Sequence, residues 1–318
     1  MNAFKKIVST MMKKIYITRD IPSVAKEMLQ KKFEVTVNKN TSLSKEELIK
    51  IVEEYDGMLS TTADKLSEEV LSHAKNLKVI ANYAIGLDNI DLRYAKSKKI
   101  AVFNLPDIVT NSSADLTFAL LLSFVRRICP SSHFVKEGKW KFWKPDLFLG
   151  EELIGKNFAI IGMGRIGQAV ARRAQGFGMN VIYYNRTKKE LPKDLTDCVE
   201  VSLEEIYKIA DYISLHVALT SETKHLINES AFKKMKKKPL LINMARGDII
   251  NSDDLVRALN EGLIRGAALD VTSPEPLSGD HPLCKIDNCL ITPHIGTSTI
   301  ECRYAMAKKA AEIILDYF

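Results

Sequence analysis

The stretch Phe158-Ala159-Ile160-Ile161-Gly162-Met163-Gly164-Arg165-Ile166-Gly167 joins an apolar run to a helix-forming segment, QAVARRAQGFG. A strand, a glycine turn and a helix are the context in which GxGxxG predicts dinucleotide binding. Gly162 permits the tight turn, Gly164 lets the backbone approach a pyrophosphate, and Gly167 allows close helix packing. Amides at the helix N-terminus, in Arg165, Ile166 and Gly167, face the phosphates in such a site. This stretch therefore predicts an α/β domain that binds a dinucleotide.

Short apolar runs alternate with helical stretches on both sides of this motif. One series runs from Ile15 to Asn104, and the second begins at Asn157 and ends in CLIT at 289–292. Such alternation predicts βα units and parallel sheets. The 318 residues also exceed one core of roughly 100 to 200 residues. We therefore expect two Rossmann-like parallel-sheet domains: a flavodoxin-like substrate domain over 1–106 and 295–318, and a dinucleotide-binding domain over 107–294, with the site in the cleft between them.

Three helices have features that can be predicted from single residues. Ser44 and Glu47 are spaced as a capping box at a helix start. A long helical segment runs from Ser112 to Glu137, and we expect Pro130 to break or kink it. The closing helix, Ser298 to Tyr317, is amphipathic and follows the second sheet, so it is expected to pack on the first domain.

Composition excludes several classes of protein. With 46% apolar and 27% charged residues, the chain has enough apolar residues for a real core. Its longest apolar stretch, 118–125, falls far short of the roughly 20 residues that span a bilayer. The net charge of +7 gathers in lysine clusters such as 233–238, which have no recognition motif beside them. We expect a solvated face here, with no nucleic acid and no membrane as partners.

The cysteines and the first residues indicate where the protein works. The five cysteines are odd in number and include no CxxC pair, which favours a reducing compartment, the cytoplasm. His281, Cys284, Cys289 and His294 match no usual zinc spacing, so no metal is expected. The basic segment 1–14 lacks the apolar region of a secretory signal, and translation can equally start at Met11 or Met12.

The loop after the second strand of the dinucleotide domain bears on the choice of cofactor. Val181–Tyr184 is followed by Asn185, Arg186, Thr187, Lys188 and Lys189, and no carboxylate comes before Glu190. An NAD enzyme usually places an acid here, on the ribose 2′-hydroxyl. Cationic and hydroxyl donors suit a 2′-phosphate better. NADP is therefore favoured, with NAD left open.

Three ionisable residues follow later strands of the same domain. Arg246 lies in NMARGD at 243–248, Glu275 in ALDVTSPEPL at 268–277, and His294 in TPHIGTST at 292–299. Ligands of open α/β sheets bind beyond the carboxyl ends of the strands, so these side chains can meet near the nicotinamide. An arginine forks onto a carboxylate, and a carboxylate beside a histidine stabilises its protonated, proton-donating form. The set indicates acid/base chemistry on a carboxylate-bearing substrate.

Together, GMGRIG, NMARGD, ALDVTSPEPL and TPHIGTST resemble the D-isomer-specific 2-hydroxyacid dehydrogenases, and the run DVTSPEPL with HPL and NC downstream is most similar to their glyoxylate/hydroxypyruvate reductases. The resemblance implies that His294 is the acid/base, that Glu275 orients and charges it, and that Arg246 anchors the substrate carboxylate and carbonyl. It implies that Ile85 and Gly86 offer backbone amides to that carboxylate, that Leu59 lines the substrate site, and that Asp270 lies beside the nicotinamide carboxamide, with Met244 and Gly296 also at the cofactor.

The aromatic segment WKFWKPDLFLG at 140–150 refines this resemblance. Trp140 and Trp143 resemble the tryptophan segment that, in glyoxylate/hydroxypyruvate reductases, reaches toward the partner subunit's active site. The resemblance implies a homodimer with Trp143 at the substrate. The alternative, that these tryptophans pack at the subunit interface without contacting the substrate, stays equally open.

The activity implied is NAD(P)H-dependent reduction of a small 2-oxo acid, glyoxylate or hydroxypyruvate, to the 2-hydroxy acid. A D-3-phosphoglycerate dehydrogenase is one alternative, but the segment Leu59-Ser60-Thr61-Thr62 offers no basic group for a substrate phosphate. A dinucleotide-sensing protein resembling the C-terminal-binding corepressors is another, since that class keeps the fold and similar catalytic residues. The basic loop after Tyr184 counts against the sensor.

Overall fold

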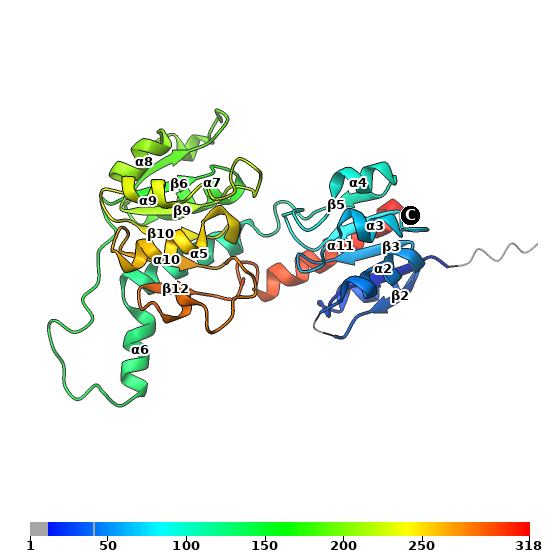
Figure 1. Ribbon diagram of the computed structural model, residues 1–318, viewed down its shortest axis with the longest axis horizontal. Helices are drawn as coiled ribbons and strands as arrows, with labels where there is room; N and C mark the ends of the chain where they lie inside the picture. The colour runs from blue at the N-terminus through cyan, green and yellow to red at the C-terminus, as the bar shows by residue number, and fades with distance from the viewer. Residues whose placement is uncertain (1–11, 41) are drawn as a thin grey trace, which may run out of the picture. The chain divides into compact units, whose positions relative to one another are not determined.

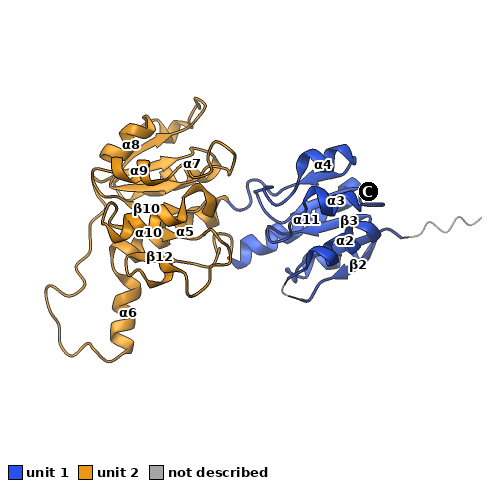
Figure 2. Cartoon of the chain, in the orientation of Figure 1, with its two compact units in different colours: residues 1–109, 299–318 blue, residues 110–298 orange. Residues whose placement is uncertain are grey.

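The computed structural model describes residues 12–40 and 42–318, which form two compact units (Figure 2). Unit 1 comprises residues up to 109 together with 299–318, and unit 2 comprises 110–298. The boundaries expected from sequence, 106 and 294, lie three and four residues earlier than these. The predictions about residues 1–11, including a start at Met11, fall outside the described part of the chain.

Unit 1 is built on a five-stranded, fully parallel sheet in the order β2-β1-β3-β4-β5 (Figure 1). Its strands are β1 (Lys14–Ile17), β2 (Glu34–Val37), β3 (Gly57–Ser60), β4 (Val79–Asn82) and β5 (Ala101–Phe103). Its helices are α1 (Val24–Leu29), α2 (Lys45–Glu54), α3 (Glu68–Ser72), α4 (Leu92–Ser97) and α11 (Ile300–Tyr317). Every residue of β3 and β4 is buried, as expected for a parallel sheet covered on both faces.

Local signals in the sequence start the helices of this unit. The predicted capping box is present, because the Ser44 hydroxyl accepts from the Glu47 amide while the Glu47 carboxylate accepts from the Ser44 amide. Ser67, Asp91 and Thr299 cap α3, α4 and α11 with their own side-chain oxygens. These oxygens satisfy amides that the first helical turn leaves without partners.

The closing helix belongs to unit 1. α11 packs against α1 and on β3 and β4. The Tyr83 hydroxyl donates to the Arg303 carbonyl at 2.7 Å, and burial raises the pKa of Tyr83 to about 12. The chain therefore returns to its first sheet after completing the second.

Unit 2 contains a seven-stranded parallel sheet in the order β12-β11-β10-β9-β6-β7-β8 (Figure 1). Its strands are β6 (Asn157–Ile161), β7 (Asn180–Tyr184), β8 (Val199–Glu200), β9 (Tyr212–Leu215), β10 (Leu240–Asn243), β11 (Gly266–Leu269) and β12 (Cys289–Ile291). Its helices are α5 (Thr110–Val125), α6 (Ile128–Lys136), α7 (Arg165–Gly176), α8 (Leu203–Ile209), α9 (Glu229–Lys234) and α10 (Ser252–Asn260), and its 3-10 turns are η1 (Lys193–Leu195), η2 (Gly247–Ile249) and η3 (Pro282–Lys285).

Two apolar clusters, one on each face, hold this sheet. α5 and α7 pack on residues such as Phe158 and Ile160, while α8, α9 and α10 pack on residues such as Ala159 and Ile213. The alternation of neighbouring strand residues between the two clusters follows from the two-residue period of a strand. Both sheets are thus of the doubly wound, Rossmann-like type predicted from sequence, and this fold prediction is confirmed.

The break between α5 and α6 does not lie where the sequence predicted it. The helices are separated at Arg126 and Arg127, and Arg127 adopts a left-handed conformation with φ of 54°. Pro130 lies in the first turn of α6, where its missing amide hydrogen breaks no helical hydrogen bond. The prediction of a break at Pro130 was therefore wrong, because a proline in a first turn is compatible with a helix that begins there.

No helix in the described ranges is long and apolar enough to cross a bilayer. All five cysteines are free thiols. Burial raises the pKa of Cys198 to about 11 and that of Cys289 to about 12, so both remain protonated near neutral pH.

Candidate active site

The glycine turn lies between β6 and α7, where three glycines meet three different constraints. Gly162 has φ of +103°, and a Cβ there would lie 2.7 Å from the backbone of His216. A Cβ on Gly167 would lie 2.2 Å from the Gly162 carbonyl oxygen, so a side chain would push α7 off the turn. A Cβ on Gly164 would meet nothing within 4 Å, which leaves its backbone open to an approaching group.

This turn has the features that a dinucleotide pyrophosphate requires. Gly164 caps α7, a helix of 12 residues whose first amides have no partner within the helix. The turn lies at the point where the strand order reverses, since β6 pairs with β7 on one side and β9 on the other. Open α/β sheets bind ligands at such a switch point. The residues present therefore fit a dinucleotide.

Two residues of the loop after β7, Asn185 and Arg186, already form polar contacts within unit 2. The Asn185 side chain accepts from the Met163 amide at 3.2 Å and donates to the Thr187 carbonyl at 2.7 Å, which ties the loop to the glycine turn. The Arg186 guanidinium forms an ion pair with Glu222, and both side chains are well exposed. Exposed pairs of this kind contribute little energy, so Arg186 is available to a stronger anionic partner.

Arg246 follows β10 in a turn that is held by Asn243. The Asn243 side chain accepts from the Ala245 amide at 3.0 Å and donates to the Arg246 carbonyl at 2.9 Å. Asn243 is fully buried at the strand end, so these bonds fix the backbone from which Arg246 extends. Gly247 completes the turn, since a Cβ there would lie 2.0 Å from the Thr272 carbonyl oxygen.

The turn that carries His294 is held by a buried carboxylate. Asp270 follows β11 and is 2% exposed, and its oxygens accept from the Thr292 hydroxyl at 2.7 Å, the Ile295 amide at 2.8 Å and the Gly296 amide at 2.7 Å. A Cβ on Gly296 would lie 3.1 Å from an Asp270 oxygen and 3.3 Å from Met244 Cε. His294 itself has φ of 53°, a left-handed conformation that a non-glycine residue adopts only where its surroundings enforce it.

His294 and Glu275 form the central pair of the site. His294 Nδ1 lies 2.5 Å from Glu275 Oε1, and the Thr272 amide donates to the other carboxylate oxygen at 3.4 Å. Partial burial opposes ionisation of Glu275, but the hydrogen bond and charge of His294, with help from the Thr272 amide and Arg246, lower the pKa of Glu275 below its ordinary value. The carboxylate is therefore ionised at neutral pH, and its bond to Nδ1 leaves Nε2 for another partner.

Arg246 and His294 thus both act on the Glu275 carboxylate, in the unit that holds the glycine turn. Comparison with known proteins identifies the family of the chain. The family model for the NAD binding domain of the D-isomer specific 2-hydroxyacid dehydrogenases matches residues 118–296. A glyoxylate reductase of Pyrococcus horikoshii is 43% identical over 309 residues, which cover 96% of this chain and 92% of that protein. The chain belongs to the D-isomer specific 2-hydroxyacid dehydrogenase family.

Solved structures agree with this assignment. A Thermus thermophilus protein has a TM-score of 0.89 at 44% identity, with 95% of this chain and 96% of that chain covered. The NADPH-dependent glyoxylate/hydroxypyruvate reductase of Sinorhizobium meliloti, solved with NADP and malonate, has a TM-score of 0.84 at 26% identity, with coverages of 96% and 94%. The predicted family is confirmed, and unit 2 is the family's nicotinamide dinucleotide domain.

Sequence reasoning about this dehydrogenase missed the residues that hold the functional groups. Asn243 was quoted only as part of a motif, and Asp270 was assigned to the cofactor although its carboxylate also holds the His294 turn. Ser273 donates to Asp248 at 2.5 Å, which ties the Glu275 segment to the Arg246 segment. The one feature of the sequence that could have indicated the role of Asn243 is that a polar residue ends a buried strand there.

His216, after β9, is a second group that the sequence did not single out. Its Nε2 lies 2.8 Å from the Ser214 hydroxyl, and burial lowers the pKa of His216 to about 3. The imidazole is therefore neutral at working pH, and its backbone packs against Gly162. His216 therefore packs beside the glycine turn at the switch point of the sheet.

The remaining predicted residues have different surroundings. In unit 1, Ile85 is 37% exposed, whereas Leu59 is fully buried within β3, backbone and side chain alike. In unit 2, Trp143 is 76% exposed within a segment without helix or strand. Arg165 is exposed at the start of α7.

Proposed function

We propose that this dehydrogenase reduces glyoxylate and hydroxypyruvate, with NADPH as the preferred cofactor, to glycolate and the D-2-hydroxy acid. The observation that carries the proposal is the 2.5 Å contact between His294 and Glu275 with the charge of Arg246 acting on the same carboxylate. The names of the relatives support the substrate class, since the Pyrococcus protein is a glyoxylate reductase.

In this mechanism His294 gives its Nε2 proton to the carbonyl oxygen of the substrate. Glu275, ionised and bonded to Nδ1, fixes the tautomer and orientation of the imidazole and stabilises its protonated form. Arg246 binds the substrate carboxylate and the polarised carbonyl oxygen. In unit 1, the amides of Ile85 and Gly86 have the role that the family resemblance implies for them, as donors to a substrate carboxylate.

The nicotinamide cofactor is held by residues of unit 2. The glycine turn with the α7 amides would bind the pyrophosphate, and Met244, Asp270 and Gly296 would hold the nicotinamide end. When bound, the reduced nicotinamide supplies the hydride that the carbonyl carbon accepts. Asn185, Arg186, Thr187 and Lys188 bind the ribose 2′-phosphate of NADPH, which supports NADPH over NADH.

We also propose that the enzyme is a homodimer in the cytosol. None of the residues of α6 is buried, and the aromatic segment after it exposes Trp140, Phe142 and Trp143 by 56%, 65% and 76%. Exposed apolar clusters of this kind usually mark an interface. The five free thiols fit a reducing compartment.

The deciding experiment measures turnover of glyoxylate, hydroxypyruvate, pyruvate and 3-phosphohydroxypyruvate with NADPH and NADH. We expect the highest kcat/KM for glyoxylate or hydroxypyruvate with NADPH. Preference for the phosphorylated substrate would indicate a phosphoglycerate dehydrogenase. Tight dinucleotide binding without turnover of any 2-oxo acid would indicate a sensor and would refute the proposal.

A further inference from the structure

In the turn after β4, three consecutive backbone carbonyls each accept a hydrogen bond. The Ala84 carbonyl accepts from the Leu105 amide at 2.8 Å, the Ile85 carbonyl from Asn104 Nδ2 at 2.7 Å, and the Gly86 carbonyl from Asn82 Nδ2 at 2.8 Å. In a planar trans peptide the N–H points opposite to the carbonyl of the same unit. These bonds therefore fix the directions of the Ile85, Gly86 and Leu87 N–H groups.

Of the two side chains that hold these carbonyls, Asn82 is more deeply buried than Asn104. It is fully buried at the end of β4, and its Oδ1 accepts from the Ser60 hydroxyl at 2.9 Å. Its Nδ2, besides reaching Gly86, lies 3.1 Å from Asn89 Oδ1. The side chain cannot rotate without losing all three contacts, so the Gly86 carbonyl has a rigid partner.

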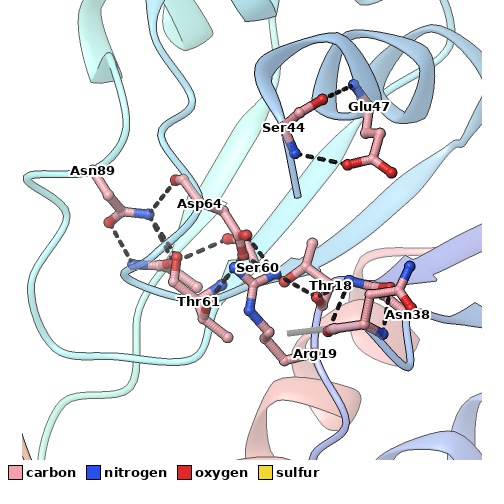
Figure 3. A network of polar contacts seen from close by, with 11 residues as sticks. Thr18, Arg19, Asn38, Ser44, Glu47, Ser60, Thr61, Asp64 and Asn89 are labelled. Atoms are coloured by element: carbon pink, nitrogen blue, oxygen red, sulfur yellow. Dashed lines mark hydrogen bonds and ion pairs between the residues drawn. The ribbon is translucent and has the colours of Figure 1, made fainter. Parts of the chain in front are cut away.

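Asn89 extends the same network across the ends of β3 and β1 (Figure 3). Asn89 Nδ2 donates to the Thr61 carbonyl at 2.9 Å and to the Asp64 carbonyl at 3.0 Å. The Asp64 carboxylate in turn accepts from the Thr61 amide at 2.8 Å and from the Thr18 hydroxyl at 2.5 Å. The loops that follow three strands are thereby joined through side chains.

An ion pair anchors the far end of this network. Arg19 Nη1 lies 3.0 Å from Asp64 Oδ1, and the two side chains are 16% and 0% exposed. The pair lies where the strand order of unit 1 reverses, between β1 and β3. A carboxylate this deeply buried needs its charge partner and its hydrogen bonds, so the ends of these strands are held together strongly.

We propose that Asn82, oriented by Asn89 and anchored through Asp64 and Arg19, is a positioning residue. Its bond to the Gly86 carbonyl clamps the end of the turn whose Ile85 and Gly86 amides, directed by the bonds of the Ala84 and Ile85 carbonyls, bind the carboxylate of the substrate. This inference rests on the proposed function, because a 2-oxo acid is the ligand that the amides bind. It adds that substrate affinity depends on a buried side chain that touches no substrate atom. Preorganised amides bind an anion more tightly, since no ordering is required when it arrives.

The test compares Asn82→Ala with Asn38→Ala in the full chain. Asn38 is a matched control, a 6% exposed asparagine at the end of β2 that also donates to a backbone carbonyl, of Thr18. We expect Asn82→Ala to raise KM for glyoxylate about 3- to 10-fold, the loss of roughly one hydrogen bond, with the Kd for NADPH unchanged. Asn38→Ala should lower thermal stability without changing KM. Equal KM values in wild type and Asn82→Ala would refute the proposal.

A binding measurement separates this inference from the proposed activity. Oxamate, a carboxylate that cannot be reduced here, is titrated into ¹⁵N-labelled protein, and the Ile85 and Gly86 amide signals are followed. We expect both signals to shift, with affinity reduced in Asn82→Ala, reduced less in Asn89→Ala, and unchanged in Asn38→Ala. If Asn82→Ala does not fold, Asn89→Ala decides.

Unshifted amide signals in the wild type, or wild-type oxamate affinity in the deciding variant, would overturn the inference. Absence of turnover alone would refute only the proposed function, because the oxamate titration measures anion binding at the turn and does not depend on catalysis.

Discussion

At the scale of single residues, the turns that carry Arg246 and His294 are each held by a polar residue at the end of a buried strand. Asn243 holds the Arg246 turn and Asp270 holds the His294 turn, both from within the interior of unit 2. Asn82 has the same place in unit 1. Buried hydrogen-bonding groups of this kind are rigid, so they can set the directions of more exposed groups that react.

The role of His294 predicts the outcome of its removal. His294→Ala should lower kcat by about 10²- to 10⁴-fold, because positioned acid catalysis contributes that much. NADPH affinity should be unchanged in a fluorescence titration. Near wild-type kcat on every 2-oxo acid tested would show that another group supplies the proton.

Glu275→Gln tests the charge of the pair separately from its geometry. Glutamine can still accept a hydrogen bond from Nδ1, but the negative charge is lost. Because the pKa of Glu275 is lowered, the wild-type carboxylate stays ionised below its ordinary value of about 4.3. Wild-type activity in reduction should therefore persist below that pH, whereas Glu275→Gln should be less active at every pH tested and should lack the acidic fall that protonation of the carboxylate causes. Identical pH profiles would show that the charge has no role.

His216 predicts a pH dependence of stability. The unfolded chain protonates this histidine below about pH 6.5, whereas burial lowers the folded pKa to about 3. The unfolded state thus binds the extra proton, and the free energy of unfolding falls as pH drops from 6.5 toward 3, with a slope approaching about 1.4 kcal/mol per pH unit. His216→Gln should give a flatter dependence of the thermal midpoint between pH 7.5 and 5. His73→Gln, at an exposed site, should follow the wild type.

At the scale of elements, signals that act within a few residues were readable from sequence and signals that depend on packing were not. The Ser44 capping box and the glycine turn need only their own neighbours, and both were predicted. The break at Arg127 was missed because nothing in the arginine pair marks a left-handed residue. Asp270 holds a turn 22 to 26 residues further along the chain, and Asn82 accepts from Ser60 on a different strand, so these contacts could not be predicted from neighbouring residues.

The loop after β7 predicts how cofactor choice can be changed. Arg186→Ala should lower kcat/KM for NADPH about tenfold or more while changing the NADH value little, since a charge-assisted hydrogen bond contributes roughly 1.5–3 kcal/mol. Glu222→Gln is the complementary variant, because it removes the anion that pairs with Arg186, and it should improve NADPH binding. Steady-state kinetics at fixed glyoxylate measure both. A wild type at least as efficient with NADH would show that the loop is a solvated basic turn.

At the scale of the whole molecule, α6 and the segment after it lack a core of their own. A nine-residue helix is marginal in water unless packing supports it, yet none of the residues of α6 is buried within the chain. Phe134 and Phe148 contact edge to face and join the two ends of the segment. Ile128, Val135 and Leu149 remain 48%, 51% and 72% exposed, which supports the proposed dimer interface.

The exposed surface of residues 128–149 predicts a homodimer in which a second copy of the chain covers it. A variant of Trp143 tests whether this segment also contacts the substrate. Light scattering should give twice the chain mass of 35.7 kDa. Trp143→Ala should keep that mass but change the ratio of kcat/KM values for glyoxylate and hydroxypyruvate, because only a residue at the substrate senses the added hydroxymethyl group. Trp140→Ala is the matched control, and an equal change in both variants would indicate general loss of interface packing. A stable monomer with full activity would contradict the dimer and the shared site together, since a site completed by a partner cannot work without one.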